Sequence, residues 1–222
     1  AAYVEDKNNI EKIKTDDGKY SQQVINIESG NFNKLKITEI DRLLNEETQD
    51  PYQQTLEKMV SGRYLGKLIY YLTSLIVKDN VIQGMESILN ILKNADTQDI
   101  SEWIYYGNNC NNEFGKKLRK LNPTKEQIEA LSIIIHSVIN RASMFVAVKL
   151  ASLIHKRNKG ILVHKPTVIV AEGAVIESLP GFKNLLQTHL NNILSDFGDY
   201  YYDIIHINKA NIIGSGIAAI IN

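Results

Sequence analysis

The hydrophobic positions along the chain follow two spacings, one typical of strands and the other typical of helices. Four short apolar runs predict strands, at residues 1–5, 22–28, 166–171 and 203–207. Longer windows, in which apolar residues recur three and four positions apart, predict helices at residues 53–78, 81–93, 124–156 and 180–194. A last short helix is expected at 217–221. Strands that alternate with helices predict an α/β domain with a largely parallel sheet.

The longest predicted helix should lie at the centre of this domain. Thr124 and Gln127 form a capping box at its start, and residues 128–154 are apolar around most of the helix circumference. By contrast, the stretch 94–123 shows no clear periodicity, and its Asn-rich run at 108–112 favours turns. We therefore expect one largely buried helix, preceded by an irregular segment.

Composition narrows the classes of partner. The 222 residues suit one globular domain, and 25 basic residues balance 25 acidic ones. A nucleic-acid or anionic-membrane surface needs a basic excess, so neither partner is expected. Basic residues and histidines interrupt the apolar runs before the roughly 18 residues that a membrane span needs. The single cysteine, Cys110, agrees with a reducing compartment, so we expect a cytoplasmic protein; the five histidines show no metal-ligand spacing.

Two carboxylates stand where ligands are often bound. Glu28 follows a predicted strand and lies close to Gly30, and the carboxyl ends of strands bind ligands in α/β sheets. Gln54 and Glu57 are three positions apart, so they share one side of a helical first turn. Each carboxylate also has a simpler explanation. Glu28 can be a solvated residue at a strand end, and Glu57 can be stabilised by the helix macrodipole alone.

The order of the motifs resembles the hexokinase and glucokinase family. Residues 26–32 read Asn-x-Glu-x-Gly-x-Phe. Residues 54–66 read Gln-x-x-Glu-Lys-Met-x-Ser-Gly-x-Tyr-Leu-Gly, which is nearly that family's signature. Further matches follow in the family's order, at Arg141-Ala142, Gly173, Pro180-Gly181-Phe182 and 214–219. The resemblance runs from one end of the chain to the other, although the stretch 94–123 does not align.

This resemblance implies a two-lobed kinase of the actin-like ATPase (ribonuclease H-like) superfamily, which closes around a sugar and MgATP. Residues 1–222 would form the hexokinase-type large, C-terminal domain, as a fragment, because the chain opens inside a predicted strand. The missing N-terminal domain would supply the catalytic aspartate and the glycine-rich phosphate loop, so no catalytic residue or metal ligand is expected here. The implied reaction moves the γ-phosphoryl group of ATP to the primary, 6-hydroxyl of a hexose. The isolated fragment should be inactive.

The resemblance also assigns residues to the two substrates. Hexose hydroxyls would be bound by four polar side chains, Asn26, Glu28, Gln54 and Glu57. An ionised carboxylate offers paired acceptors to a hydroxyl donor, in bonds stronger than neutral ones. ATP would be held at small-residue turns, where backbone amides approach phosphate and ribose closely. These nucleotide positions are Gly62, Arg63, Gly173, Ala174, Gly214 and Ser215.

Departures from the family's pattern separate this chain from typical members. They are Ser29 for a bulky residue, Lys67 for Glu, Glu172 for Asp, and Ile212-Ile213 for an acidic pair. They suggest a divergent branch, such as a fungal-type hexokinase-like protein or an N-acetylglucosamine kinase. Because the last two changes bear on the adenosine subsite, a non-catalytic sugar sensor or regulator is an alternative. A purely structural α/β module is a third interpretation, and the paired carboxylates argue against it.

Overall fold

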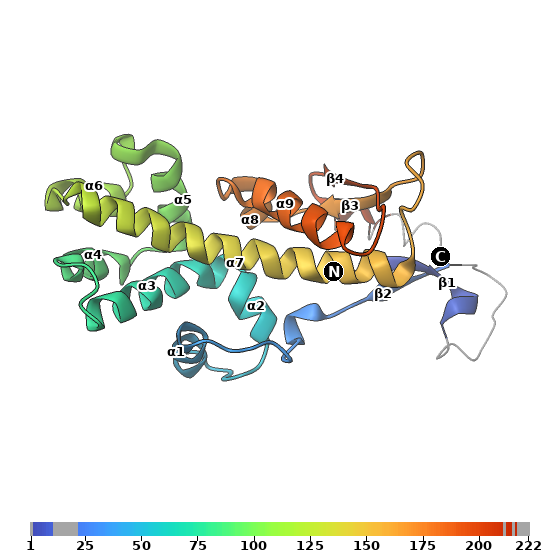
Figure 1. The fold of residues 1–222 in the computed structure, drawn as a ribbon, viewed down its shortest axis with the longest axis horizontal. Coiled ribbons are helices and arrows are strands. Elements are labelled where there is room, and N and C mark those ends of the chain that lie inside the picture. The colour runs from blue at the N-terminus through green and yellow to red at the C-terminus, as the bar shows by residue number, and fades with distance from the viewer. Residues whose placement is uncertain (1, 11–21, 211, 215, 217–222) are drawn as a thin grey trace.

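The protein is a mixed α/β molecule made mostly of helices (Figure 1). The computed structural model describes residues 2–10, 22–210, 212–214 and 216. The α-helices are α1 (Glu39–Glu47), α2 (Thr55–Val60), α3 (Gly62–Lys78), α4 (Met85–Leu92), α5 (Thr97–Tyr106), α6 (Glu113–Leu121), α7 (Lys125–Arg157), α8 (Ala174–Ser178) and α9 (Phe182–Ser195). The strands are β1 (Ala2–Asp6), β2 (Gln22–Asn26), β3 (Thr167–Ala171) and β4 (Tyr202–His206). Short 3-10 turns are η1 (Lys7–Asn9), η2 (Ser29–Asn31) and η3 (Gly107–Asn109).

Helix α7 organises the molecule. This helix runs along most of the length of the molecule, with α3 packed along one side of it and α9 along another (Figure 1). The expected capping box is present, because Thr124 Oγ1 accepts from Gln127 N and Gln127 Oε1 accepts from Thr124 N. At the other end, Asn158 takes the left-handed conformation that closes many helices. The predicted central position of this helix is confirmed, but the helix is only partly buried, because side chains such as Ile133 and Val148 are exposed.

By length and composition, α7 is also apolar enough to cross a membrane. The expectation that charged residues and histidines interrupt it too early was therefore wrong, because one or two charges in an apolar window do not disqualify a span. Its apolar side chains are used in the core, where Leu131, Ile135 and Ile154 are buried against other helices. Packing inside the domain thus accounts for part of this apolar composition, since 44% of the most apolar stretch of α7 is buried.

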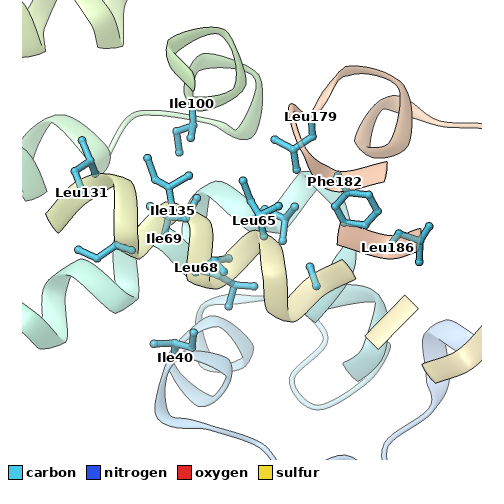
Figure 2. Close-up of a cluster of buried hydrophobic side chains, with 14 of the residues drawn as sticks. Ile40, Leu65, Leu68, Ile69, Ile100, Leu131, Ile135, Leu179, Phe182 and Leu186 are labelled. Atoms are coloured by element: carbon cyan, nitrogen blue, oxygen red, sulfur yellow. The ribbon is translucent and has the colours of Figure 1, made fainter. Parts of the chain in front are cut away.

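The hydrophobic core lies where α1, α3, α5 and α9 converge on α7 (Figure 2). Its labelled, buried members are Ile40, Leu65, Leu68, Ile69, Ile100, Leu131, Ile135, Leu179, Phe182 and Leu186. Burying one such side chain contributes about 1.5–3 kcal/mol. Because Leu65, Ile100 and Phe182 lie in the first turns of α3, α5 and α9, the cluster fixes the starts of these helices.

The strands do not form one largely parallel sheet. Within the described residues, β3 pairs in parallel with β4, with Ile169 opposite Ile204, whereas β1 pairs antiparallel with β2, with Val4 opposite Val24. Helices α8 and α9 form the crossover that a parallel pair requires. Strands β1 and β2 follow each other closely along the chain, which favours antiparallel pairing.

The helix predicted at 53–78 is two helices, α2 and α3, which meet at Ser61. Ser61 has extended backbone angles (φ −76°, ψ 137°), and its Oγ accepts a hydrogen bond from Arg63 N. Serine is a favoured N-cap and Gly62 is a poor helix former, so the chain turns here. The apolar spacing continues through the break because both helices bury residues in the core, as Met59 and Leu65 show.

Other helix boundaries also differ from the sequence pattern. Helix α4 begins at Met85 rather than at residue 81, because Gly84 precedes it with a φ of 75°. Helices α1, α5 and α6 lie where no helix was predicted. Asp96 and Asn112 cap α5 and α6, with side chains that accept from the backbone N–H three residues ahead. The helix expected at 217–221 lies outside the described residues.

Candidate functional site

The first candidate site is formed by the end of β2 and the start of α2. Beyond Asn26, the chain turns through Glu28 into η2, which packs against α2 (Figure 1). A Cβ atom added to Gly30 would lie 2.6 Å from Gln54 Oε1 and 3.1 Å from Glu57 Oε2. The fold therefore brings the two segments predicted to bind sugar into direct contact.

The polar groups at this contact are accessible. Asn26, Glu28 and Glu57 are exposed, and Gln54 is partly buried. Asn26 Nδ2 donates a hydrogen bond to Glu28 Oε1, which orients that carboxylate. Among the described side chains, none pairs with the Glu57 carboxylate. Both carboxylates can thus accept hydrogen bonds from a ligand.

Backbone strain is concentrated at this contact. Glu28, Tyr52 and Gln54 hold left-handed backbone angles, with φ of 45°, 61° and 50°. The other described non-glycine residues with positive φ are Asn80, Asn122, Asn158 and Lys209. Asparagine tolerates this region, whereas for most residues it costs about 1–2 kcal/mol each. Because such strain clusters at ligand sites, it favours a functional site here over a solvated strand end.

The second candidate site is a groove between the starts of α3 and α8 and one face of α5. A Cβ atom on Gly62 would lie 3.0 Å from Val175 Cγ2, so the glycine lets α8 approach α3. Gly173 precedes α8 with φ 125° and ψ 152°, a combination that is essentially confined to glycine. The groove measures about 790 Å³, within the range of small-molecule sites. Its lining includes Gly62, Arg63, Thr97, Ser101, Tyr105 and Ala174.

The structure gathers part of the predicted nucleotide site. Gly62, Arg63 and Ala174, which were predicted to bind ATP, line the groove, and Gly173 directly precedes Ala174. Gly214 is exposed, has no atom within 4 Å of an added Cβ, and does not line this groove. Ser215 lies outside the described residues. The roles of Gly214 and Ser215 stay predictions.

Helix α5 contributes groove residues that the sequence pattern did not identify. Gly66 N donates to Thr97 Oγ1 at 2.8 Å, and a Cβ atom on Gly66 would lie 3.0 Å from the backbone of Asp96 and Thr97. This close packing of α5 on α3 puts Ser101 and Tyr105 beside the groove. The available signal was the spacing of Asp96 and Asp99, which forms a capping box.

A second hollow, of about 550 Å³, shares Arg63 with the groove. Lys67 Nζ and Tyr71 Oη both donate to the Glu47 carboxylate, and the Lys67 hydrogen bond holds the pKa of Glu47 below its usual value. Burial, together with the bond to Glu47, raises the pKa of Tyr71. Lys67 therefore forms an exposed ion pair with Glu47. Such pairs contribute at most about 1 kcal/mol. The family whose motifs this chain resembles usually has Glu at the position of Lys67.

A comparison with protein families decides the assignment. The family model described as Hexokinase matches residues 1–221. The chain belongs to the hexokinase family. The resemblance seen in the ordered motifs is thereby confirmed, whereas the fungal-type and N-acetylglucosamine kinase interpretations stay predictions.

Curated hexokinases align with most of the chain. Rice hexokinase-7 (Oryza sativa) is 28% identical over 228 residues, which cover 99% of this chain and 48% of that protein. Plasmodium falciparum hexokinase is 30% identical over 183 residues, which cover 80% of this chain and 36% of that protein. The chain thus spans about half the length of the hexokinases it matches, or less.

Solved hexokinases share the fold. A hexokinase from Schistosoma mansoni, complexed with glucose, superposes with a TM-score of 0.73 at 18% identity. The superposition covers 92% of this chain and 47% of that one. The chain therefore has the hexokinase variant of the actin-like ATPase fold, as the sequence predicted.

Proposed function

We propose that the whole protein transfers the γ-phosphoryl group of ATP to the 6-hydroxyl of a hexose. In this proposal residues 1–222 form the large domain, which supplies the sugar-binding carboxylates and part of the nucleotide site. The observation that carries the proposal is the contact of Gly30 with Gln54 and Glu57, in a chain of the hexokinase family. The similar Schistosoma mansoni hexokinase was solved with glucose, which supports a sugar ligand.

The first candidate site suits the hydroxyls of a sugar. Glu28 and Glu57 are acceptors when ionised, whereas Asn26 and Gln54 can both donate and accept. Charge-assisted hydrogen bonds to carboxylates are stronger than neutral ones. A site of this kind rejects analogues that lack a hydroxyl, because its acceptors would be left unpaired.

The second candidate site suits ATP. Gly62, Gly173 and Ala174 leave room for backbone amides to approach phosphate or ribose, and the exposed Arg63 guanidinium suits an anionic ligand. The described residues contain no cluster of three or more His, Cys, Asp or Glu that could bind a metal ion. In this proposal magnesium is bound to the ATP phosphates, where it neutralises charge during phosphoryl transfer.

The proposal places the catalytic base and the phosphate loop outside this chain, in a domain that the longer relatives possess. Phosphoryl transfer depends on positioned groups from both sides of the cleft, so residues 1–222 alone should not turn over. A cytoplasmic location is part of the same proposal. It is supported by Cys110, which is a free, buried thiol.

A non-catalytic sugar sensor is the second candidate function. Ile212 and Ile213 occupy positions where the hexokinase family usually has an acidic pair. Their side chains are 69% and 48% exposed. The apolar side chains at these positions cannot make the polar contacts that carboxylates would make to the nucleotide. This observation favours a protein that keeps the sugar site and has weakened its nucleotide site.

A panel of sugars separates these candidates. We expect the full-length protein to convert glucose, mannose, fructose or N-acetylglucosamine to its 6-phosphate when ATP and magnesium are present. Coupled detection of ADP gives the rate, and mass spectrometry with NMR gives the phosphorylated position. Binding of a hexose without turnover would establish the sensor, and neither binding nor turnover would overturn the proposed function.

Replacing Gly30 by Ala should weaken hexose binding by the full-length protein about tenfold, near the worth of one hydrogen bond. The added Cβ would stand 2.6 Å from Gln54 Oε1, so the Gln54 side chain must move away. The unfolding temperature should change little, because the two closest atoms, Gln54 Oε1 and Glu57 Oε2, end flexible side chains, and Glu57 Cβ is farther away at 3.3 Å. Titration calorimetry measures the affinity, with Ser29→Ala as the control in the same turn. Equal affinity of the Gly30→Ala and parent proteins would show that this contact lies outside the hexose site.

A further inference from the structure

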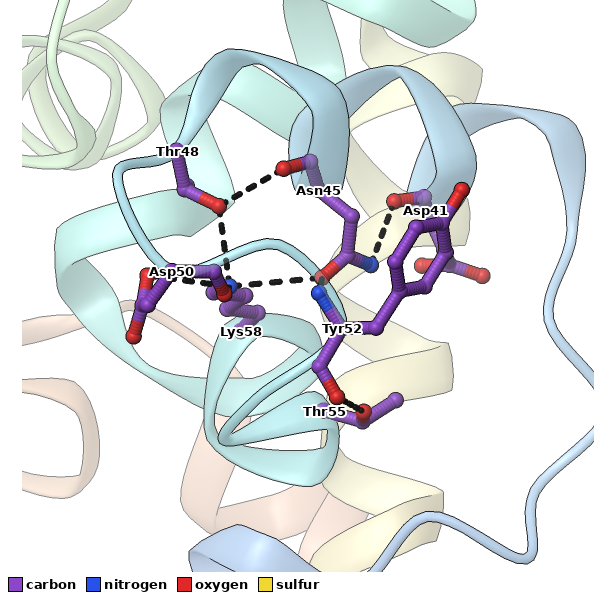
Figure 3. Close-up of polar contacts among 7 residues, drawn as sticks. All are labelled: Asp41, Asn45, Thr48, Asp50, Tyr52, Thr55 and Lys58. Carbon is purple, nitrogen blue, oxygen red and sulfur yellow. Dashed lines mark hydrogen bonds and ion pairs between the residues drawn. The ribbon is translucent and has the colours of Figure 1, made fainter.

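A buried lysine lies next to the sugar-site carboxylate in the sequence. Lys58 follows Glu57 on α2 and is 1% exposed. Its Nζ donates to Thr48 Oγ1 at 2.9 Å and to the Asp50 backbone oxygen at 2.6 Å (Figure 3). It also lies 3.3 Å from Asn45 Oδ1 and 3.1 Å from the Asp50 carboxylate. Lys58 thereby joins α2 to the end of α1 and to the loop between them, residues 48–54.

The same loop is held from α1 by Asn45. Asn45 Oδ1 accepts from Tyr52 N at 3.0 Å, and Asn45 Nδ2 donates to the Asp41 backbone oxygen at 2.8 Å (Figure 3). The Thr48 hydroxyl donates to the Asn45 backbone oxygen at 2.8 Å. Loop residues on both sides of Pro51 are thus tied to Asn45 or to Lys58.

This network ends at the sugar-site contact. The loop carries Tyr52 and Gln54 with φ of 61° and 50°, and Gln54 then packs against Gly30. Left-handed angles at two non-glycine residues persist only where surrounding contacts impose them. Asn45 holds Tyr52 N, and Thr55 Oγ1 donates to the Tyr52 backbone oxygen at 3.2 Å. The Lys58 ammonium holds Thr48 and Asp50, which precede Tyr52 and Gln54 in the loop.

The burial of Lys58 is not explained by core packing. Removing an ammonium group from water is costly unless its three donors are satisfied. Two of the four contacting oxygens belong to Asp50 and a third belongs to Thr48. Most of the contacts that offset the desolvation cost of the ammonium group are therefore made to the 48–54 loop. An apolar side chain would fill the same space without the desolvation cost, but it would leave the loop unanchored.

We propose that Lys58 is a positioning residue for the hexose site. It holds the 48–54 loop in its left-handed turns, so that the Gln54 amide stands beside Glu57 and faces Gly30. This inference rests on the proposed function, because it assigns Gln54 to the hexose. Lys58 itself touches no substrate, and it acts through the conformation of the loop.

Replacing Lys58 by Met in the full-length protein tests the inference. We expect the dissociation constant for the preferred hexose, measured by calorimetry, to rise about tenfold, while that for ATP changes less than about twofold. In a Gln54→Ala background, the same substitution should weaken hexose binding less than about twofold, because the group that Lys58 positions is gone. Lys117→Met removes an exposed lysine of α6 and should change neither constant.

The contrary outcomes are distinct. Unchanged hexose affinity in Lys58→Met, an equal loss of hexose and ATP affinity, or full additivity with Gln54→Ala would each overturn the positioning role. If Lys58→Met does not fold, Thr48→Ala keeps the lysine and removes one anchor, and the same three results apply to it. The proposed function fails separately, if the parent protein binds no hexose or if Gln54→Ala and Glu57→Gln both leave hexose binding intact.

Discussion

Replacing Arg141 by Met should lower the free energy of unfolding by about 3 kcal/mol, because it leaves a buried carboxylate without its cationic partner. The Arg141 guanidinium on α7 donates to both oxygens of Asp41 on α1, at 2.9 and 2.8 Å. Asp41 is 1% exposed, and the other hydrogen bonds to its carboxylate come from Thr38. Urea unfolding of the full-length protein, followed by circular dichroism, measures the loss.

Arg42 provides the matched control on α1. Its guanidinium contacts the carboxylates of Glu39 and Glu46 at 2.5 Å, so the geometry is as close as that of Arg141. All three side chains are well exposed, and exposed pairs contribute little. Arg42→Met should therefore leave the urea midpoint unchanged. If the two substitutions cost the same, burial of the Asp41–Arg141 pair is not what stabilises the attachment of α1.

The Arg141 prediction also bears on the site. Helix α1 carries Asn45, which anchors the 48–54 loop. Arg141 therefore holds in place the helix from which the loop is anchored. Arg141 is one of the residues that match the hexokinase motif order. Its hydrogen bonds to Asp41 give a structural reason for an arginine at this position.

Local patterns were enough to predict the long helix and the two strands of the parallel pair. Helix α7 combines a capping box with a long apolar stretch, and both signals lie within the segment itself. The break at Ser61 was missed because apolar spacing continues through it while a local cap ends one helix and begins another. Helices α5 and α6 were missed because Asp96 and Asn112 are typical of turns as well as of helix starts.

The candidate site was predictable only in part, since its central contact is tertiary. Glu28 and Glu57 were identified from motif order, but no local pattern shows that Gly30 packs against Gln54. The burial of Lys58 was equally hidden, because a lysine beside a glutamate in a helix is usually solvated. Side chains that act through distant partners become visible only once the fold is known.

Replacing Glu57 by Gln should reduce the catalytic efficiency of the full-length protein with its preferred hexose about 10- to 150-fold. This corresponds to about 1.5–3 kcal/mol, the worth of a hydrogen bond to a charged group. Gln keeps the size of the side chain, but it removes the charge and replaces one acceptor oxygen by a donor NH2 group. Initial rates at varied hexose concentration give kcat/KM, and saturating ATP isolates the effect on the sugar.

Glu113→Gln separates this role from helix stabilisation. Glu113 lies in the first turn of α6, as Glu57 lies in the first turn of α2, so both carboxylates favour their helix by the macrodipole. The two substitutions should have similar, small effects on unfolding, and only Glu57→Gln should affect hexose use. Equal kcat/KM for Glu57→Gln and the parent protein would show that Glu57 does not bind the hexose and only stabilises α2.

A crystal structure of the full-length protein with bound hexose tests the central claim most directly. We expect hydroxyl groups of the sugar within about 2.5–3.0 Å of the Glu28 and Glu57 carboxylates, the distance of O–H···O hydrogen bonds, with Asn26 and Gln54 beside them. The 48–54 loop should keep the contacts to Lys58 described above. A hexose bound elsewhere, with neither Glu28 nor Glu57 in hydrogen-bonding contact, would contradict the account.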